Sequence, residues 1–355
     1  MKSIKNNGEA PQPYRVYNAL KDKWSLISPH RAFRPWSGQI EKIEEEEIPD
    51  YDPNCYLCPC NKRVGDNINP KYTSTFVFVN DHSALLPDVA ESPLVLSENN
   101  ELFKTEKETG ICEVVCYSPS HDKTMMNMSN QELEKVIDVW KERFITIGSR
   151  RDINHVLIFE NRGKEMGASN PHPHGQIWAQ KHIPHLVAVE IEQQKKYLHI
   201  NGKNMLLDYL KEEIKRGDRL VYKNPDFVVV VPFWAEWPYE TMILPKPHIS
   251  GIDELNKQQA TNLAKSLALV TKTYANMFNR PKYGTSYTMG IHQKPTDGKK
   301  HPHLQMHIHF EPPWLTPSRL KFMVGYERFG EQQRDITPEQ AAQTLRKAAG
   351  SISIS

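Results

Sequence analysis

The sequence predicts an α+β protein built around a mainly antiparallel sheet. Segments with the composition of strands outnumber helical segments, and they follow one another in hairpin-like order rather than in strict β-α alternation. The same order of elements occurs twice along the chain, which indicates a duplication. The sequence contains no glycine-rich phosphate loop, so it gives no support to a P-loop or Rossmann fold.

The first half of the chain begins with strands expected at residues 75–79 and 113–117. The second of these strands ends in Ser118-Pro119-Ser120-His121. An amphipathic helix is expected over residues 129–147, followed by a strand over 156–160 that leads to a histidine motif. The apolar residues of this helix recur at helical spacing, namely Leu133, Val136, Ile137, Trp140 and Phe144.

The second half repeats this order. Each half ends on a strand with alternating histidines, which divides the chain into expected domains at residues 1–185 and 186–355. A helix is expected over residues 186–215, and a short terminal helix over 337–349 begins with Thr337 as its cap. The repeated elements are expected as strands at residues 227–231, 240–244 and 301–310 and as a helix at 256–278.

The composition argues against several classes of protein. Among 355 residues, 45 are basic and 43 are acidic, so the net charge of +2 creates no field that would attract nucleic acid or an anionic membrane. The longest apolar stretch, residues 227–235, contains Pro232 and falls short of the roughly 20 residues of a membrane-spanning helix. Residues 1–15 are polar and lack the apolar core of a secretory signal, so a cytoplasmic location is expected.

The most informative segment is Asn170-Pro171-His172-Pro173-His174-Gly175-Gln176-Ile177-Trp178. Alternate residues of a strand share one face, so His172, His174 and Gln176 are expected to point into one pocket. A neutral imidazole is nucleophilic near pH 7, and neighbouring donors can meet the charge on phosphate oxygens. The motif therefore indicates phosphoryl chemistry, although on its own it also fits a histidine-rich strand edge without a catalytic role.

The five cysteines of the chain all lie in its first third, and their odd number does not suit a disulfide framework. Cys55 and Cys58 form a C-x-x-C pair, whose spacing lets two thiolates take adjacent corners of a zinc tetrahedron. The pair alone also fits a redox site. Cys60 is a competing metal ligand because it stands at C-x-C spacing.

The histidine motif resembles the active-site signature of galactose-1-phosphate uridylyltransferases, the transferase branch of the histidine-triad superfamily. The resemblance covers nearly the whole chain, and it implies a duplicated half-barrel of mainly antiparallel strands with helices on its outer face. It also implies a homodimer. Its further segments are Ser28-Pro29-His30-Arg31-Ala32, Tyr51-Asp52-Pro53-Asn54-Cys55-Tyr56-Leu57-Cys58, Trp234-Ala235-Glu236-Trp237-Pro238 and Lys321-Phe322-Met323-Val324-Gly325-Tyr326-Glu327.

The resemblance implies a ping-pong reaction of galactose metabolism. His174 would attack the α-phosphorus of UDP-glucose, release glucose-1-phosphate and pass the uridylyl group to galactose-1-phosphate. Gln176 stands where hydrolases of the superfamily carry a third histidine. A neutral amide can hydrogen-bond a phosphoryl oxygen but cannot act as a general acid or base, so water attack on the intermediate should gain little help.

Two metal sites are implied by the same resemblance. His121 and His172 would join Cys55 and Cys58 in a structural zinc site. A second site would hold iron or zinc, because three imidazoles with one carboxylate suit either metal. Its residues also fit a hydrogen-bonded histidine cluster at the end of a sheet, and they are Glu190, His292, His307 and His309.

The substrate-binding residues are also implied by resemblance. Arg31 and Arg34 also fit an ordinary solvated surface role.

His182, His185, His301 and His303 lie near the elements of the second metal site in the sequence and are expected to be solvated. The substrate positions are as follows. The positions for nucleotide and phosphates are Arg31, Arg34, Asn80, Asp81, Asn161, Ser169 and Gln176. The positions for the hexose phosphate are Lys321, Phe322, Val324, Tyr326, Glu327 and Gln333.

The sequence departs from the family pattern at two places. Ala168 replaces a common cysteine near the phosphate positions, and residues 311–314 replace a more usual tyrosine-led segment. The second change lies between the expected metal strand and the hexose positions, so it bears on sugar preference rather than on the type of reaction. Two rival functions remain, a nucleotide-sugar phosphorylase that uses ADP-glucose and a zinc-stabilised nucleotide-sugar sensor without turnover. The intact His174-Gly175-Gln176 argues against the sensor.

Overall fold

The computed structural model describes residues 12–35, 38, 40–41, 47–88 and 101–350 of the chain. Residues 1–11, which form most of the segment expected to lack a secretory signal, lie outside the described residues. Within the described part, no helix combines the length and the apolar character that a membrane crossing requires.

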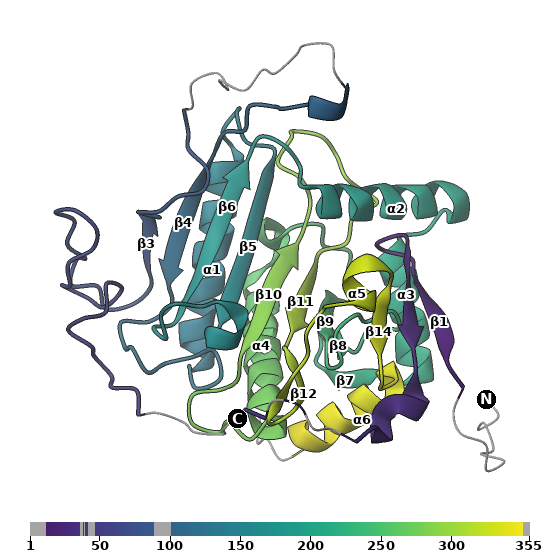
Figure 1. Ribbon diagram of the computed structural model, residues 1–355. Coiled ribbons are helices and arrows are strands. Elements are labelled where there is room, and N and C mark those ends of the chain that lie inside the picture. Colours follow the sequence, from purple (N-terminus) through teal and green to yellow (C-terminus); the bar gives the residue numbers. More distant parts are fainter. Residues whose placement is uncertain (1–11, 36–37, 39, 42–46, 89–100, 351–355) are drawn as a thin grey trace.

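A nine-stranded sheet forms the centre of the molecule (Figure 1). Every pair of neighbouring strands in it runs antiparallel, which confirms the predicted fold class. In sheet order its strands are β3 (Phe76–Val79), β4 (Gly110–Cys116), β6 (His174–Gln180), β5 (His155–Arg162), β10 (Tyr287–His292), β11 (His307–Glu311), β9 (Thr241–Pro245), β8 (Phe227–Val230) and β7 (Leu220–Lys223).

The strand order shows the internal repeat. In the first half the order is β3-β4-β6-β5, and in the second half the corresponding strands follow as β10-β11-β9-β8. The two halves meet where β5 pairs with β10, with Ile158 opposite Ile291. The expected boundary after residue 185 falls at the start of a helix, and the division into two domains stays a prediction.

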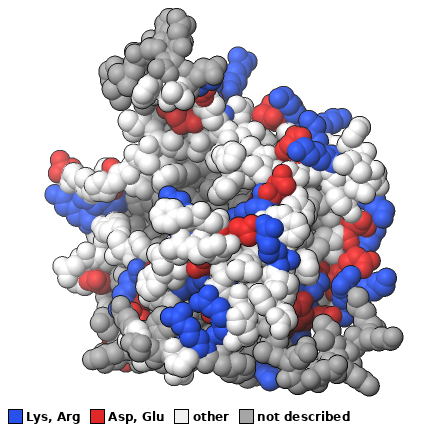
Figure 2. Space-filling model, turned by 45° about the vertical axis from the view of Figure 1, so that its right-hand side comes forward, with Lys and Arg blue, Asp and Glu red and all other residues white. Residues whose placement is uncertain are grey.

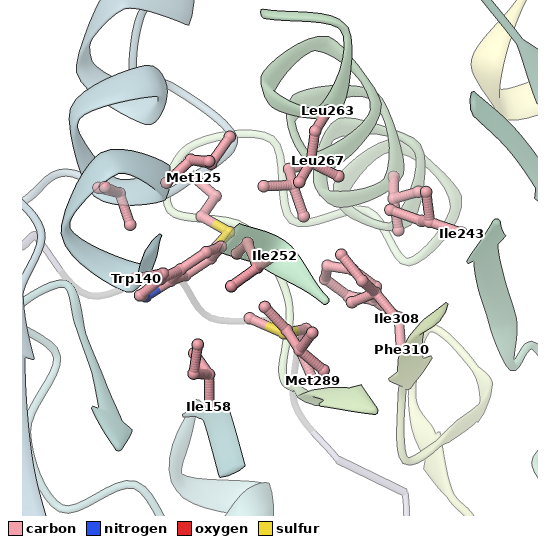
Figure 3. Packing of buried hydrophobic residues seen from close by; sticks show 14 of the residues in the cluster. Met125, Trp140, Ile158, Ile243, Ile252, Leu263, Leu267, Met289, Ile308 and Phe310 are labelled. Carbon is pink, nitrogen blue, oxygen red and sulfur yellow. The ribbon is translucent and has the colours of Figure 1, made fainter. Parts of the chain in front are cut away.

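Two long helices, α1 (Asn130–Gly148) and α4 (Lys257–Met277), cover one face of this sheet (Figure 1). Trp140 of α1 and Leu263 of α4 are both fully buried, and they belong to one continuous apolar core with the strand residues Ile158 and Ile308 (Figure 3). Removing a buried side chain of the size of Trp140 costs about 3–5 kcal/mol, so this layer fixes the sheet on one side. The functional side chains are left to the opposite face.

Local sequence explains where these helices begin. Ser129 caps α1, with its hydroxyl accepting from the amide of Glu132 while the Glu132 carboxylate accepts from the amide of Ser129. Such a cap contributes about 1 kcal/mol. Asn256 and Gln259 form the same reciprocal pair at the start of α4.

The segment expected as one helix over residues 186–215 forms two helices, α2 (His185–Asn201) and α3 (Met205–Arg216). The break has a local cause, because Gly202 adopts a left-handed conformation with φ of 64° and Asn204 caps the next helix. The helix α2 lies over β10 and β11, since Glu190 and Gln194 line a small cavity together with His292 and His307.

The remaining elements frame this core. A small sheet joins β1, β2 and β14, and α6 starts after the predicted cap Thr337. Their bounds are β1 (Tyr14–Asn18), β2 (Lys23–Ile27), β12 (Trp314–Thr316), β13 (Arg319–Leu320), β14 (Gln332–Arg334), α5 (Tyr326–Phe329) and α6 (Pro338–Ala349), with short 3-10 helices η1 (Pro29–Phe33), η2 (Glu101–Phe103), η3 (Lys164–Met166) and η4 (Ile252–Glu254). On the face in Figure 2, basic and acidic side chains are interspersed.

Candidate active site

A cavity of about 620 Å³ lies on the sheet face opposite α1 and α4. Its walls come from β3, β4, β5 and β6 and from the loops around residues 56–64 and 167–169. Six of the residues predicted for catalysis and nucleotide binding line it, namely Asn80, Asp81, Asn161, Ser169, His174 and Gln176. Side chains that are far apart in the sequence are therefore brought together by the antiparallel pairing of β4, β6 and β5.

His174 is held in one tautomer. Its Nδ1 lies 2.7 Å from the carbonyl oxygen of His172, so Nδ1 carries the proton and donates it to that oxygen. Burial lowers the pKa of His174 to about 4, and the neighbouring Arg162 acts in the same direction. At neutral pH the ring is therefore uncharged and Nε2 keeps its lone pair beside the cavity.

Gln176 is oriented by the next side chain on the same face of β6. The indole nitrogen of Trp178 donates to Oε1 of Gln176 at 2.9 Å. Since Oε1 is engaged in this way, the amide NH₂ is the group that Gln176 offers to the cavity it lines. The site thus presents a neutral nitrogen nucleophile and an amide donor two residues apart.

Gly175 allows the close packing behind these two residues. A Cβ atom at this position would lie 2.0 Å from the hydroxyl of Tyr117 and 2.9 Å from the carbonyl oxygen of Phe159. Any side chain would therefore push β6 away from its neighbours. The glycine is required by space, and the position of the histidine beside it depends on that fit.

Arg63 and Phe78 line the same cavity, and the sequence did not single them out. The guanidinium of Arg63 lies 3.8 Å from the ring centroid of Phe78, and its Nε lies 3.4 Å from a carboxylate oxygen of Asp81. Arg63 therefore holds the Asp81 carboxylate in place. The available signal in the sequence was its position five residues after the segment with family resemblance that ends at Cys58.

The four residues predicted to hold zinc converge. One donor atom from each of Cys55, Cys58, His121 and His172 lies within 4.8 Å of the others, and all four residues are buried. The Sγ of Cys58 is 3.5 Å from Nδ1 of His121 and 3.5 Å from Nδ1 of His172. A tetrahedral zinc ion with its usual bond lengths separates sulfur and nitrogen donors by about 3.6 Å, so the donors fit that ion.

This arrangement corrects one prediction. His172 precedes β6 and lies in a bend, so its ring does not share the pocket with His174 and Gln176. Its Nε2 lies 2.9 Å from the carbonyl oxygen of Ser118, and Nδ1 is therefore left for the metal cluster.

Two residues that support this cluster were missed by the sequence reasoning. The Asn170 amide donates to Sγ of Cys55 at 3.2 Å, while its oxygen accepts from the amide of His172 at 2.9 Å. The hydroxyl of Tyr72 lies 3.0 Å from Nε2 of His172. Asn170 stands at the start of the histidine motif, which was the available signal, whereas Tyr72 lies outside the quoted segments.

The second predicted metal cluster also converges. Glu190, His292, His307 and His309 each place a donor atom within 4.8 Å of the others. Nδ1 of His292 is 2.6 Å, and Nε2 of His307 is 3.3 Å, from the same oxygen of Glu190. Burial raises the pKa of Glu190, but the facing imidazoles of His292 and His307 outweigh it and hold that pKa well below its usual range. The donor set fits a divalent cation.

The residues predicted for the hexose phosphate form a separate group that does not line the 620 Å³ cavity. Nζ of Lys321 is 2.6 Å from the Glu327 carboxylate and 3.0 Å from the backbone oxygen of Gln333. Three apolar neighbours in the group are exposed, namely Phe322, Val324 and Tyr326. The described part of the chain therefore brings most of the residues predicted for the nucleotide together but leaves those predicted for the hexose phosphate elsewhere.

The two predicted arginines also lie outside that cavity. Arg31 pairs with Asp335 at 3.6 Å, and Asp335 in turn accepts from the side chain of Gln333. Arg31 therefore lies beside the residues predicted for the hexose phosphate rather than beside those predicted for the nucleotide. Arg34 is exposed. Among the histidines expected to be solvated, His303 is buried, so the prediction is wrong for that residue.

Comparison with known proteins decides the family. A model of the N-terminal domain of galactose-1-phosphate uridyl transferase matches residues 3–184, and the model of its C-terminal domain matches residues 190–353. The chain belongs to the galactose-1-phosphate uridylyltransferase family. It is therefore a nucleotidyltransferase, as the resemblance of the histidine motif predicted.

The matches to relatives in this uridylyltransferase family extend over nearly the whole chain. The galactose-1-phosphate uridylyltransferase of Haemophilus influenzae is 46% identical over 335 residues, which is 94% of either chain. The enzyme of the same name from Saccharomyces cerevisiae is 40% identical and covers 96% of this chain and 95% of its own.

Solved structures show the same fold. A uridylyltransferase structure matches with a TM-score of 0.75 and 23% identity, covering 89% of this chain and 97% of that one. An ADP-glucose phosphorylase from Arabidopsis thaliana matches with a TM-score of 0.72 and 23% identity, covering 97% and 100%. The uridylyltransferase fold is thus shared with an enzyme whose printed name specifies an adenine nucleotide.

Proposed function

We propose that this chain transfers the uridylyl group from UDP-glucose to galactose-1-phosphate through a covalent intermediate on His174. The observation that carries the proposal is the tautomer of His174. Because its Nδ1–H donates to the carbonyl of His172 at 2.7 Å, Nε2 is the nucleophilic nitrogen beside a cavity of about 620 Å³. The names of relatives that match over most of their length specify galactose-1-phosphate and uridylyl transfer, which supports the proposed acceptor and the transferred group.

The proposed reaction has two displacements at the α-phosphorus. In the first, the lone pair of Nε2 forms a bond to phosphorus, and the bond from phosphorus to the oxygen of glucose-1-phosphate breaks. In the second, a phosphate oxygen of galactose-1-phosphate attacks the same phosphorus and the bond to His174 breaks, giving UDP-galactose. Two inversions leave the configuration at phosphorus retained.

Gln176 stabilises the transferring group and disfavours hydrolysis. Its NH₂ donates to a phosphoryl oxygen as negative charge shifts onto that oxygen. A carboxamide neither accepts nor gives up a proton as an acid or base at neutral pH, so a water molecule that enters the site finds no general base at this position. The acceptor phosphate is already anionic and needs no base.

The nucleotide is proposed to bind along the cavity. Asn80 and Asp81 hold uracil and ribose, with Arg63 fixing the Asp81 carboxylate at 3.4 Å. Asn161 and Ser169 contact the phosphates. All of these residues line the same cavity as His174, which supports the assignment.

The metals are proposed to have structural roles. Zinc held by Cys55, Cys58, His121 and His172 would neutralise thiolate charge and tie the loop after residue 50 to the residues before β6. The Glu190 cluster would hold iron or a second zinc. The chain's own contribution is to fix His172, whose carbonyl oxygen orients His174.

The hexose phosphate is proposed to contact Lys321, Glu327 and Gln333 of a second copy of the chain. These residues do not line the cavity that holds His174, so one chain alone does not assemble the complete site. The neighbouring Phe322, Val324 and Tyr326 are exposed by 57–66%, which suits a surface that a partner covers. A homodimer would place this group at the partner's cavity, together with Arg31.

Initial-rate kinetics test this proposal. With UDP-glucose and galactose-1-phosphate as varied substrates, parallel double-reciprocal plots are expected because the first product leaves before the second substrate reacts. Intersecting plots would contradict the covalent intermediate. A higher kcat/KM for ADP-glucose with phosphate would favour the phosphorylase, and absence of turnover with both pairs would favour the sensor.

A further inference from the structure

A third cluster of metal-binding groups lies beside the Glu190 cluster. Glu240, His309 and Glu311 each place an oxygen or nitrogen atom within 4.8 Å of the others. Glu240 directly precedes β9, and the other two residues alternate on β11, so the register of these neighbouring strands creates the cluster. His309 belongs to both clusters, whereas the two carboxylates belong to this one alone.

The imidazole of His309 is buried and lacks hydrogen-bond partners. Its exposed fraction is 6%, and within the described residues neither ring nitrogen has a hydrogen bond. Nδ1 lies 3.5 Å from Oε1 of Glu240, which is longer than a hydrogen bond of normal strength. Buried imidazole nitrogens are usually satisfied; one of these nitrogens is accounted for by the Glu190 cluster, and Nδ1 is left facing the carboxylate of Glu240.

The position of Glu240 is fixed independently of that ligand. Its Oε2 accepts from the amides of Glu236, at 2.7 Å, and Trp237, at 3.3 Å. These two bonds leave Oε1 directed toward His309. One donor of the cluster is therefore already held in position by the backbone.

The cations near this cluster make their direct contacts elsewhere, although Lys21 and Arg334 lie close enough to act on Glu240. The nearby ammonium groups of Lys21 and Lys23 both pair with Glu236, at 3.2 Å and 2.8 Å. Glu240 and Glu311 are left facing each other without a direct ion pair to a lysine or arginine in the described part of the chain. Two carboxylates at this distance repel each other in a protected site unless a cation or a proton lies between them.

The cluster also has an open side. His309 and Glu311 line a cavity of about 400 Å³, together with His292, Thr288 and Trp237. A cation bound by three protein donors needs further ligands, and water can supply them from this cavity. The space is distinct from the 620 Å³ cavity that contains His174.

We propose that Glu240, Glu311 and Nδ1 of His309 hold a divalent cation beside the one in the Glu190 cluster. Two carboxylate oxygens and one imidazole suit an ion of the Mn²⁺ or Fe²⁺ class rather than a thiophilic ion. The second nitrogen of His309 serves the neighbouring cluster. A neutral ring carries one N–H, so binding at both nitrogens releases that proton to solvent.

Metal uptake by Glu311→Gln tests this site. Purified wild type, E311Q and the control E192Q are equilibrated with Mn²⁺, freed of unbound ion by gel filtration and analysed by mass spectrometry for all metals. Glu192 is an exposed residue of α2, so its change removes the same charge without touching the cluster. Wild type and E192Q should retain one more metal equivalent per chain than E311Q. Titration should show Mn²⁺ affinity reduced by at least about 10-fold in E311Q.

Equal metal content and equal Mn²⁺ affinity in wild type and E311Q would overturn the proposal and assign the space between the carboxylates to a proton. Circular dichroism checks the fold of the variant. If E311Q does not fold, the wild type decides the question alone. Wild-type protein that saturates with one ion at the cysteine cluster and one at the Glu190 cluster, and takes up no further Mn²⁺, contradicts the site.

Discussion

The strands β6 and β11 place a histidine in the same hydrogen-bonded setting in the two halves of the molecule. Nδ1 of His174 donates to the carbonyl oxygen of His172 at 2.7 Å, and Nδ1 of His307 donates to that of Gln305 at 3.0 Å. The side chains of His172 and Gln305 in turn donate to backbone oxygens at the ends of β4 and β9. The duplicated fold therefore prepares two equivalent imidazoles.

The two imidazoles differ in what faces them. Nε2 of His174 borders a cavity of about 620 Å³, whereas Nε2 of His307 meets the carboxylate of Glu190 at 3.3 Å because α2 lies over β11. The next residue on the same face is Gln176 in one half and His309 in the other. An amide beside a cavity suits transfer chemistry, whereas a second imidazole beside a carboxylate suits metal binding.

The residue between the two cavity-side positions of each strand differs as well. It is Gly175 in β6 and Ile308 in β11, and both positions point toward the helices α1 and α4. Ile308 fills its space in the core, whereas the space behind Gly175 is taken by the hydroxyl of Tyr117. One backbone thus supports either role, and the covering elements determine which role an imidazole has.

The largest expected difference between the halves is in turnover. His174→Asn should lower kcat by about 10⁶-fold, the scale observed when a covalent nucleophile is removed. His307→Asn should instead lower metal content and melting temperature, while the folded fraction keeps most of its turnover. Steady-state assays with metal analysis measure both effects, and an equal loss of turnover in the two variants would contradict the division of roles.

The next largest effect concerns the zinc cluster. Cys55→Ser should remove one zinc equivalent and lower the free energy of unfolding by about 4 kcal/mol, at the upper end for single substitutions. Cys60→Ser is the matched control, because Cys60 is exposed and stands outside the cluster. Metal analysis and thermal melting decide the assignment, and a zinc loss in the Cys60 variant would transfer the ligand role to that residue.

Gln176 should affect turnover more than binding. Gln176→Ala is expected to lower kcat by about 100- to 1,000-fold with little change in KM, as for the loss of one donor to a developing charge. Trp178→Phe keeps the amide but removes the indole donor at 2.9 Å. The kcat of that variant should fall by only about 5-fold, which is equivalent to about 1 kcal/mol. Near wild-type kcat in Gln176→Ala would remove this residue from the mechanism.

Gln176→His makes β6 more similar to the strand of a hydrolase. If the amide protects the intermediate from water, the ratio of UDP-glucose hydrolysis to uridylyl transfer should rise in this variant. Product analysis with and without galactose-1-phosphate measures that ratio. An unchanged ratio would show that the neutrality of Gln176 is not what excludes hydrolysis.

The smallest expected effect tests the packing behind the motif. Gly175→Ala should cost about 1–3 kcal/mol of stability, because its Cβ would lie 2.0 Å from the Tyr117 hydroxyl. Tyr117→Phe removes that oxygen, which has no hydrogen-bond partner among the described residues, so this change alone should be nearly neutral. The double variant should recover part of the loss in a denaturant titration. Failure to recover would assign the requirement for glycine to the Phe159 carbonyl.

Much of the fold could be predicted from the sequence because its periodic signals are local. The helix α1 shows apolar residues at helical spacing and a reciprocal cap at Ser129, and both features act within a few residues. The strand β10 was not predicted as an element of the repeat. Its residues Tyr287, Met289 and Ile291 are buried and alternate with less buried residues, so a strand signal was present, but its pairing with β5 comes from the distant first half.

The Cys55–Cys58 pair could be predicted because its spacing is restrictive, and the resemblance to the family implied the other ligands of both clusters. The residues that support the two sites could not be predicted, since Tyr72 and Arg63 act through contacts with residues farther along the sequence. The direction of His172 was mispredicted for a related reason. Strand alternation placed its ring with His174, but β6 begins at His174 and the bend before it turns His172 toward Cys58.

Mapping of the covalent adduct tests the division between β6 and β11 most directly. The protein is incubated with UDP-glucose alone, digested under mildly alkaline conditions that preserve a phosphoramidate, and analysed by tandem mass spectrometry. A uridylyl group is expected on His174 and absent from His307, and addition of galactose-1-phosphate should discharge it. An adduct on His307 or on any residue other than His174, or protein that reacts with both substrates without forming one, would contradict the central claim.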